Sequence, residues 1–440
     1  MNKLILLLFF TVNLHSQEIL SERQRAQVIN NILKDRLDNV LPIVMDKSNI
    51  DMWILISREY NEDPVLKTFL PAEWLNARRR TILLFYRNIN NNTTEKLAVA
   101  RYNFGDNILS AWNKEVQPNQ WKRLVELIEE RNPKRIGINY SKDFNISDGL
   151  DKTDYDEFMS HLPVSLKDKI VSAETLSNLW IETRTEKEMN VYNTIIDLTH
   201  NIIKEAFSNN TIKVGKTSTT DLEWWMRQKL TDLGLNTWFH PTVDIQRSNE
   251  FNNDHLDSFS NRPENKIINY GDLLHCDFGI NYLRLNSDCQ QMAYVMRESD
   301  KEVPKFLQTA FDKGNQLQDI LTNNFVEGKS GNEILLKSLD EAKYLDLKPS
   351  IYTHPLGSYG HSSGPTIGMW DSQQGVPGAG DYPLNYKTVY AIELNITTYI
   401  SEWKRDIKIM LEEAGYYSEE GFRYINSRQT KILEIPFIKQ

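Results

Sequence analysis

Two aspartates, Asp277 and Asp288, are the first residues of this 440-residue chain whose types and spacing could do chemistry. Each belongs to a short segment rich in apolar and β-branched residues, which predicts two strands at 273–280 and 289–296 joined by a turn. If Asp277 pairs with Asp288 across these strands, the carboxylates lie on one face with their Cβ atoms about 5 Å apart. Like charges that close require a compensating charge, and a pair of divalent metal ions would supply it. The alternative is that both aspartates are ordinary turn residues.

The same pairing would place the two cysteines of the chain, Cys276 and Cys289, opposite each other. They would lie on the face of the hairpin that points away from the aspartates, so we do not expect them to bind metal. In an oxidising compartment they could form a cross-strand disulfide. The alternative is a pair of buried free thiols that pack as small apolar groups.

Three later segments contain residues that could complete a metal site. A stretch rich in glycine and proline holds His354 and His361, and it is expected to be a loop whose backbone approaches another group closely. Glu393 lies in the middle of an apolar, strand-like run, where an unpaired charge is costly. Glu412 and Glu413 follow another apolar run, and alternation along a strand predicts that one faces inward and the other outward.

Together these segments offer four carboxylates and one imidazole. So many negative charges around one cavity would require cations, and oxygen ligands with one nitrogen suit Mn²⁺, Co²⁺, Fe²⁺ or Zn²⁺. Two such ions about 3.5 Å apart would hold a bridging hydroxide. The candidate ligands in chain order are Asp277, Asp288, His354, Glu393 and Glu412.

This order and spacing resemble the pita-bread metallopeptidases of family M24, which include Xaa-Pro aminopeptidases, Xaa-Pro dipeptidases (prolidases) and methionine aminopeptidases. The family pattern has an aspartate in a strand after Gly-Asp and a second aspartate eleven residues later. A His-x-x-Gly-x-x-x-His motif and two glutamates in strands then follow. The matching residues are Asp277 after Gly271-Asp272, Asp288, His354, Gly357, His361, Glu393 and, nine residues before Gly421, Glu412.

The resemblance covers about residues 180–440 and implies an α+β chain whose C-terminal part has the pita-bread fold. The smaller α/β unit before it resembles the creatinase-type N-terminal domain of the Xaa-Pro members, which favours that branch over methionine aminopeptidases. We therefore expect a signal peptide at 1–16, a creatinase-like domain at 17–178 and the catalytic domain at 179–440.

For the metal site, the resemblance implies two divalent ions, with manganese favoured and cobalt, zinc or iron as alternatives. Asp277 would chelate one ion. Asp288 and Glu412 would bridge both ions. His354 and Glu393 would complete the other.

For the reaction, the resemblance implies an exopeptidase that hydrolyses the amide bond between an N-terminal residue and proline through a metal-bridging hydroxide. Glu393 would take the proton and pass it to the leaving prolyl nitrogen. His361 would hydrogen-bond the substrate or the developing oxyanion. The family also implies a homodimer or larger assembly. The alternative function is a metallohydrolase of this fold without proline preference.

Some positions depart from the family pattern. The proline that usually follows the strand glutamate is Leu394, and the arginine usually found two residues before the last glutamate is Met410, with Lys408 as a candidate replacement. The substrate-binding histidine expected before the first aspartate has no counterpart at the usual spacing. His255 and His240 are the nearest candidates. These departures bear on substrate preference more than on metal binding.

The N-terminal region is expected to hold the elements of a small α/β unit and no catalytic cluster, so its predicted role is positioning, capping or dimerisation. A capping box formed by Thr183 and Glu186 would open the first helix of the second domain. The predicted elements before it are helices at about 20–40 and 119–131 and strands at 50–57, 80–87, 96–102 and 135–140.

The composition and the first residues limit the class of protein and its expected location. An apolar run after Lys3 predicts a secretory signal peptide, so the mature protein is expected to be secreted or periplasmic. No other stretch approaches 18 apolar residues, so no membrane span is expected. The net charge of −9 argues against a nucleic-acid partner. The one dense basic run, residues 78–80, is expected to be a solvated flank of the strand that follows.

Overall fold

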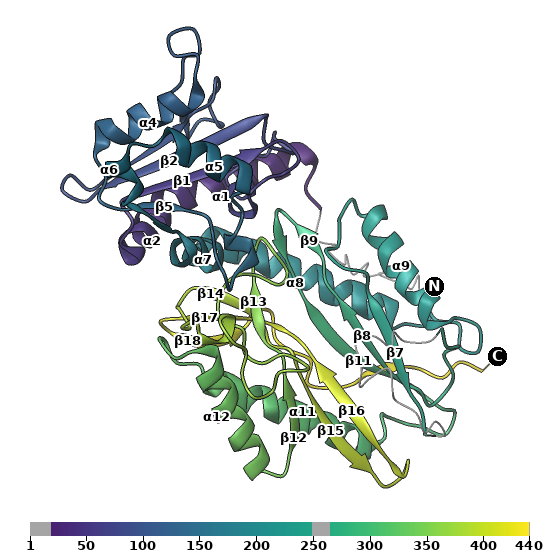
Figure 1. The fold of residues 1–440 in the computed structure, drawn as a ribbon. Helices are drawn as coiled ribbons and strands as arrows, with labels where there is room; N and C mark the ends of the chain where they lie inside the picture. The colour runs from purple at the N-terminus through teal and green to yellow at the C-terminus, as the bar shows by residue number, and fades with distance from the viewer. Residues whose placement is uncertain (1–18, 249–264, 440) are drawn as a thin grey trace, which may run out of the picture.

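The computed structural model describes residues 19–248 and 265–439. Figure 1 shows a smaller α/β part, whose last helix ends at Glu182, beside a larger part built from helices and several sheets. The predicted α+β class is therefore confirmed. The predicted signal peptide lies outside the described residues. No helix within the described ranges is long and apolar enough to cross a membrane.

The smaller part is built on one mixed sheet. Its strands are β1 (Met52–Arg58), β2 (Arg80–Asn88), β3 (Thr93–Ala98), β4 (Leu109–Ser110), β5 (Ile136–Ile138) and β6 (Ile170–Ser172), in the order β4-β3-β2-β1-β5-β6. Its longer helices are α1 (Glu22–Asn39), α2 (Leu41–Ser48), α4 (Gln120–Arg131), α5 (Lys152–His161) and α7 (Glu174–Glu182), and two short ones are α3 (Pro64–Lys67) and α6 (Val164–Lys167).

Strand β1 lies at the centre of this sheet and is buried on both faces. Trp53 packs into a core with α1, α2 and α7, while the next residue, Ile54, packs into a second core with α4 and α5. This two-sided burial explains why residues 52–56 are all apolar instead of alternating with polar residues. The strand expected at 96–102 lies earlier in the chain than predicted, because β3 runs from Thr93 to Ala98. The domain boundary placed at 178 falls inside α7 and stays a prediction.

The larger part contains three main sheets. Their orders are β19-β11-β8-β7, β12-β15-β16 and β13-β14-β17-β18. The strands are β7 (Thr242–Gln246), β8 (Leu273–Phe278), β11 (Cys289–Val295), β12 (Lys348–Ile351), β13 (His354–Leu356), β14 (Thr388–Ala391), β15 (Leu394–Ile400), β16 (Arg405–Leu411), β17 (Ala414–Ser418), β18 (Gly421–Tyr424) and β19 (Leu433–Ile435), with a small ribbon of β9 (Asn281–Tyr282) and β10 (Leu285–Asn286).

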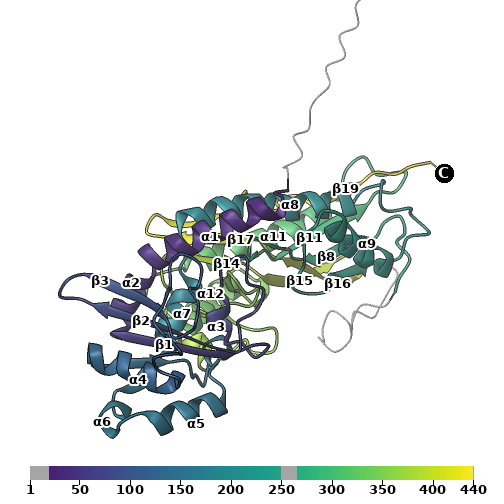
Figure 2. The same cartoon turned by 90° about the horizontal axis from the view of Figure 1, so that it is seen from above.

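Helices cover one side of these sheets. Figure 2 shows α8 and α11 running along that side, with α1 beside α8. The residues of α8 and α9 pack into one core with β7, β8 and β11, and those of α11 and α12 pack into another with β12, β15 and β16. The bounds are α8 (Glu186–Ala206), α9 (Thr219–Asp232), α11 (Lys305–Asn323) and α12 (Gly331–Tyr344).

The predicted register of the β8–β11 hairpin is wrong by two residues. Asp277 lies opposite Gln290, not Asp288. The turn is centred on Leu283 and Arg284, which both have positive φ, 54° and 65°, as the two-residue turns that suit the twist of a hairpin require. Arg284 is held in this conformation by donating hydrogen bonds to main-chain carbonyls of the smaller part, at Leu70 and Pro71.

A shift by two residues moves side chains along the hairpin but keeps each on its face. Asp277 and Asp288 therefore still share one face, as diagonal neighbours. The predicted pairing of Cys276 with Cys289 is wrong for the same reason, because Cys276 lies opposite Gln291. Both cysteines are free thiols, buried in the core beneath α8. Of the two alternatives, the pair of apolar free thiols is the one that the structure contains.

The capping box at the start of α8 also lies two residues further on than predicted. Thr183 ends α7, and its hydroxyl donates to the carbonyl of Leu179. The box is formed by Thr185 and Glu188. Glu188 is buried and pairs with Arg36 of α1 at 2.8 Å, so the start of α8 is tied to the smaller part.

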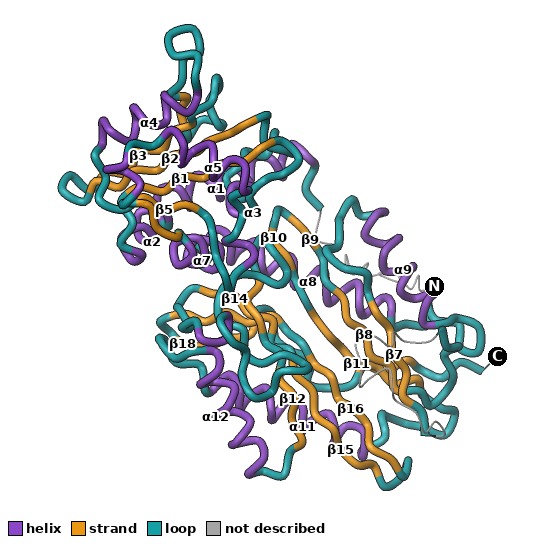
Figure 3. Tube along the Cα trace, in the orientation of Figure 1, coloured by secondary structure: helices purple, strands orange, loops and turns teal. Residues whose placement is uncertain are grey.

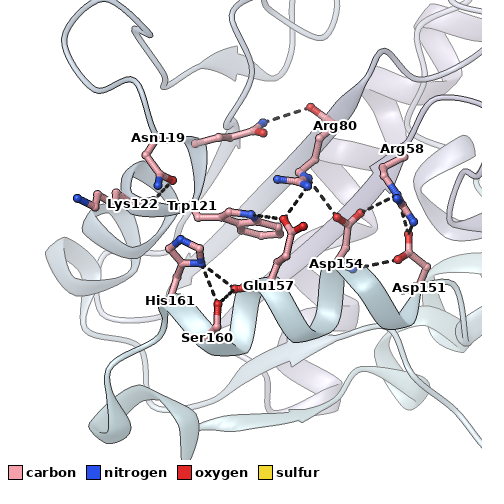
Figure 4. Close-up of polar contacts among 11 residues, drawn as sticks. Arg58, Arg80, Asn119, Trp121, Lys122, Asp151, Asp154, Glu157, Ser160 and His161 are labelled. Carbon is pink, nitrogen blue, oxygen red and sulfur yellow. Dashed lines mark hydrogen bonds and ion pairs between the residues drawn. The ribbon is translucent and has the colours of Figure 1, made fainter.

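The basic run at 78–80 is only partly solvated. Arg78 and Arg79 are exposed, but Arg80 turns inward over the ring of Trp121 and pairs with Asp154 at 3.1 Å (Figure 4). Asp154 is fully buried, and Arg58 approaches its other oxygen at 3.5 Å. Two arginines on β1 and β2 thus hold helix α5 against the sheet through one carboxylate.

Replacing Asp154 with alanine should leave two arginines beside a buried site without their shared partner. We expect a loss of about 1–3 kcal/mol in the free energy of unfolding, below the usual figure for a buried pair because both arginines are partly exposed. Urea unfolding measures it. Asp156→Ala on the same helix, which breaks an exposed pair with Lys152, is the matched control and should cost under about 0.5 kcal/mol. Equal losses in the two variants would contradict this assignment.

Candidate metal centre

All five predicted ligands lie together in the larger part of the chain. Oxygen atoms of Asp277, Asp288 and Glu412 lie within 4.8 Å of one another. A ring nitrogen of His354 and one carboxylate oxygen each of Glu393 and Glu412 also lie within 4.8 Å of one another. Glu412 belongs to both groups, so the two groups form one continuous cluster.

Three of these residues lie where the chain passes from one sheet to another. His354 begins β13 just after β12 ends, Glu393 separates β14 from β15, and Glu412 separates β16 from β17. Figure 3 shows β12, β15 and β16 as neighbours in the larger part, with β14 nearer the smaller part. The expectation that Glu393 lies in mid-strand is therefore wrong: a break in pairing lets its side chain turn toward the cluster.

Main-chain hydrogen bonds align these breaks side by side. The amide of Gln290 on β11 donates to the carbonyl of Glu412, that of Ile392 to Glu413, and that of Tyr352 to Glu393. The prediction that one of the two neighbouring glutamates faces outward is also wrong. Glu413 is buried on the opposite face of the sheet, 2.7 Å from His200 of α8.

The carboxylates of the cluster oppose one another electrostatically. Burial raises the pKa of all four carboxyl groups, and repulsion from Glu412 is the next largest raising cause for the other three. Burial lowers the pKa of His354 to about 4, so this imidazole is neutral at physiological pH. Its Nδ1–H donates to the carbonyl of Pro355 at 3.2 Å, which leaves the Nε2 lone pair facing the carboxylates.

Buried polar atoms without a hydrogen-bond partner mark the centre of this cluster. They are acceptor atoms, and a cation between them would stabilise each of them. Three carboxylate oxygens and one imidazole nitrogen are the donor set that divalent ions such as Mn²⁺, Co²⁺ or Zn²⁺ accept, so the residues fit the expected metal. These atoms are Asp277 Oδ1, Asp288 Oδ1, His354 Nε2 and Glu412 Oε1.

His361 lies at the edge of the cluster, where it is exposed. Its ring centroid is 4.6 Å from that of His354, and its Nε2 is 3.4 Å from the hydroxyl of Tyr352. Beside it opens a cavity of about 520 Å³ lined by Trp238, Asn286 and Tyr359, among others. His361 is therefore placed to contact a molecule in this cavity and the cluster at once.

Trp238 and Tyr352 line this region and were not identified from the sequence. Trp238 stands edge-on to His361 at 5.1 Å between ring centroids, and it packs against two glycines. A Cβ on Gly360 would come within 2.4 Å of the indole, and one on Gly279 would come within 2.7 Å of its nitrogen. The glycine-rich loop does make a close approach, as predicted, and the group that it approaches is Trp238.

The two histidines considered for substrate binding have different outcomes. His240 contacts helix α9, with its ring 5.0 Å from that of Trp224 and its Nε2 3.7 Å from Glu223. No described contact joins it to the cluster, and its role in substrate binding stays a prediction. His255 lies outside the described residues.

Comparison with known proteins adds two findings on the fold. An X-Pro aminopeptidase from Thermotoga maritima MSB8 is 15% identical, with a TM-score of 0.61 over 91% of this chain and 100% of that chain. An Xaa-Pro dipeptidase from Bacillus anthracis is 16% identical, with a TM-score of 0.55 over 94% of this chain and 100% of that chain. At sequence identities this low, the similarity shows a shared fold alone.

A third protein that shares this fold is not named as a peptidase. The N-terminal domain of the FACT complex subunit SPT16 from Cicer arietinum is 11% identical, with a TM-score of 0.52 over 94% of this chain and 99% of that chain. Comparison with curated protein sequences gives no match. The family model of metallopeptidase family M24 matches residues 192–424, more than half of the chain. The chain therefore belongs to metallopeptidase family M24, and it is a hydrolase of pita-bread fold with an additional N-terminal domain.

Proposed function

We propose that this protein is an exopeptidase that uses two divalent metal ions, with manganese favoured, to hydrolyse the bond between an N-terminal residue and proline. The observation that carries the proposal is the group of four buried acceptor atoms at the centre of the cluster, which lack any hydrogen-bond partner. The X-Pro and Xaa-Pro peptidases that share the fold support the choice of substrate class.

In this proposal Asp277, Asp288, His354, Glu393 and Glu412 hold the ions. When bound, the ions supply Lewis acidity toward the amide carbonyl and activate a water molecule. The chain supplies the geometry, because the β8–β11 hairpin positions the two aspartates and the sheet junctions position the two glutamates before any ion binds. A fixed site avoids the cost of reorganising its charges during the reaction.

Glu393 is the carboxylate assigned to proton transfer. Its side chain is 24% exposed, against 6% for Asp288 and 1% for Glu412, so it is the glutamate that reaches the solvent-facing edge of the cluster. From there it can accept a proton and deliver it to the leaving nitrogen. His361, at the same edge, donates a hydrogen bond to the substrate.

A prolyl amide has no N–H, so a pocket around the proline ring can be lined by apolar surface. The indole of Trp238 offers such a surface beside His361.

The mature protein is proposed to be secreted or periplasmic because of the predicted signal peptide. Its first residue, Gln17 in this proposal, can be read by N-terminal sequencing. A homodimer or larger assembly is proposed on the family resemblance and can be checked by light scattering.

Replacing Asp288 with alanine should abolish hydrolysis and reduce bound metal, because Asp288 groups with Asp277 and Glu412 and also lies 3.7 Å from His354 Nε2. Metal content by mass spectrometry and peptide hydrolysis measure the two effects. Cys289→Ala changes the next residue, whose side chain faces the other side of the hairpin, and should keep both properties. An Asp288→Ala protein with full metal content and activity would overturn the metal site.

Xaa-Pro dipeptides or Xaa-Pro tripeptides should be cleaved with a kcat/KM at least about tenfold above that of the matching Xaa-Ala peptides. Reconstitution with Mn²⁺, Co²⁺ and Zn²⁺ in parallel identifies the productive metal. Equal rates on Xaa-Pro and Xaa-Ala peptides would support the alternative, a metallohydrolase of this fold without proline preference. Leu394 and Met410, which replace residues usual in the family, make that comparison necessary.

Metal should stabilise the protein more at pH 8 than at pH 5.5. In the metal-free protein the raised pKa values mean that the carboxyl groups are neutral and tolerated at low pH, and that stability falls as pH rises through those values. Bound cations remove this penalty, and at 100 times its Kd each ion adds about 2.7 kcal/mol. The gain in melting temperature on adding Mn²⁺ to chelator-treated protein measures it. A gain independent of pH would contradict the assignment of these groups as ligands.

A further inference from the structure

Gln290 is a buried polar residue of β11 whose side chain contacts two glutamates of the cluster. Its amide nitrogen donates one hydrogen bond to Glu393 Oε1 at 2.8 Å and another to Glu412 Oε2 at 2.9 Å. Both N–H bonds of the amide are therefore used, and both acceptors are carboxylates of the cluster. Since ionised carboxylates only accept, these partners settle the orientation of the amide in the metal-binding form of the site.

These two hydrogen bonds distinguish the two carboxylate oxygens of each glutamate. Glu393 Oε1 and Glu412 Oε2 face Gln290. The other oxygen of each glutamate faces His354 Nε2, at 4.0 Å for Glu393 and 3.6 Å for Glu412. Glu412 Oε1 is among the buried atoms without a hydrogen-bond partner. Gln290 thus decides which oxygens are turned toward the position expected for a metal ion.

Gln290 is itself held by two further buried residues. Its carbonyl oxygen lies 2.9 Å from His275 Nε2, so this nitrogen must carry the proton and donate. The other ring nitrogen of His275 lies 3.2 Å from Asp244 Oδ2. His275 and Gln290 share the aspartate face of the hairpin, and Asp244 is on β7, which pairs with β8. The result is a continuous series of contacts from β7 to the sheet junctions.

Gln290 is also fixed through its main chain. Its N–H donates to the carbonyl of Glu412 at 2.9 Å, and its carbonyl accepts from the N–H of Glu412 at 3.3 Å. This isolated bridge joins β11 to the junction of β16 and β17. The backbone and the side chain of Gln290 therefore act on the same glutamate, so rotation of the amide away from it is opposed at both ends.

We propose that Gln290, oriented by His275 and Asp244, is a positioning residue that sets Glu393 and Glu412 for metal binding. This inference rests on the proposed function, since it assigns the two glutamates to a metal. The side-chain partner described for Glu412 is this neutral amide, in a chain where Met410 replaces the arginine usual in the family. Lys408, the replacement considered from the sequence, is not needed to explain how Glu412 is held.

The test compares two adjacent glutamines on one strand. Gln290→Met removes the amide that contacts Glu393 and Glu412 while keeping the side-chain length. Gln291→Met is the matched control, because Gln291 is equally buried but donates to Glu413 on the opposite face of the sheet. Affinity for Mn²⁺ is measured on folded protein by competition with a chelator, and thermal unfolding of the metal-free protein is measured in parallel.

We expect Gln290→Met to weaken Mn²⁺ affinity about 10- to 100-fold, the usual loss for a residue that orients metal ligands. Gln291→Met should change it less than about twofold, whatever it does to the melting temperature. Unchanged affinity in Gln290→Met, or equal losses in the two variants, would overturn the proposal. If the wild-type protein binds no divalent ion, it is the proposed function that fails, so the two failures are distinguishable.

A second pair of variants tests the support behind Gln290 and applies even if Gln290→Met does not fold. His275→Leu removes the donor to the amide oxygen and should weaken Mn²⁺ affinity at least about tenfold. His275→Gln keeps a donor at a similar distance and should restore most of that loss. Identical affinities in these two variants would show that the contact from His275 to Gln290 does not position the metal ligands.

Discussion

Four carboxylates and one imidazole occupy one buried position, and their mutual repulsion constrains the rest of the structure. Each carboxyl group has a raised pKa because burial and its neighbours disfavour the charged form. A chain gains nothing in stability from such a cluster, since removing charges from water costs several kcal/mol for each ion. The hydrogen-bonded strands hold the carboxylates close together. A cation bound between them would replace their mutual repulsion with attraction to the cation.

The sheet junctions provide that rigidity. His354, Glu393 and Glu412 each lie at a break between two strands, and main-chain hydrogen bonds join the breaks to one another. The smaller part of the molecule adds a second constraint. Arg284 in the turn of the aspartate hairpin donates to the carbonyls of Leu70 and Pro71, so the register of the hairpin depends on a region outside the metallopeptidase fold.

The chemistry of the site could be predicted from the sequence, whereas its register could not. A buried charge in an apolar run is visible in one dimension, so Glu393 and Glu412 could be identified together with the two aspartates and His354. The turn at Leu283 and Arg284 uses positive φ without glycine or asparagine, so it carries no sequence signal. Trp238 gave no signal of its own either, because its contacts with Gly279 and Gly360 come from distant parts of the chain.

The fold by itself cannot select a function, since proteins with different names share it at similar TM-scores. The choice between an enzyme and a binding scaffold therefore depends on features that a scaffold has no physical reason to keep. Four buried acceptor atoms without partners are such a feature, because each raises the free energy of the folded chain unless a cation fills the space between them. The glutamine amide that turns two of the carboxylates toward that space is another. The unpaired acceptor atoms lower stability in the absence of metal, and this imbalance favours a metal-dependent enzyme over a scaffold.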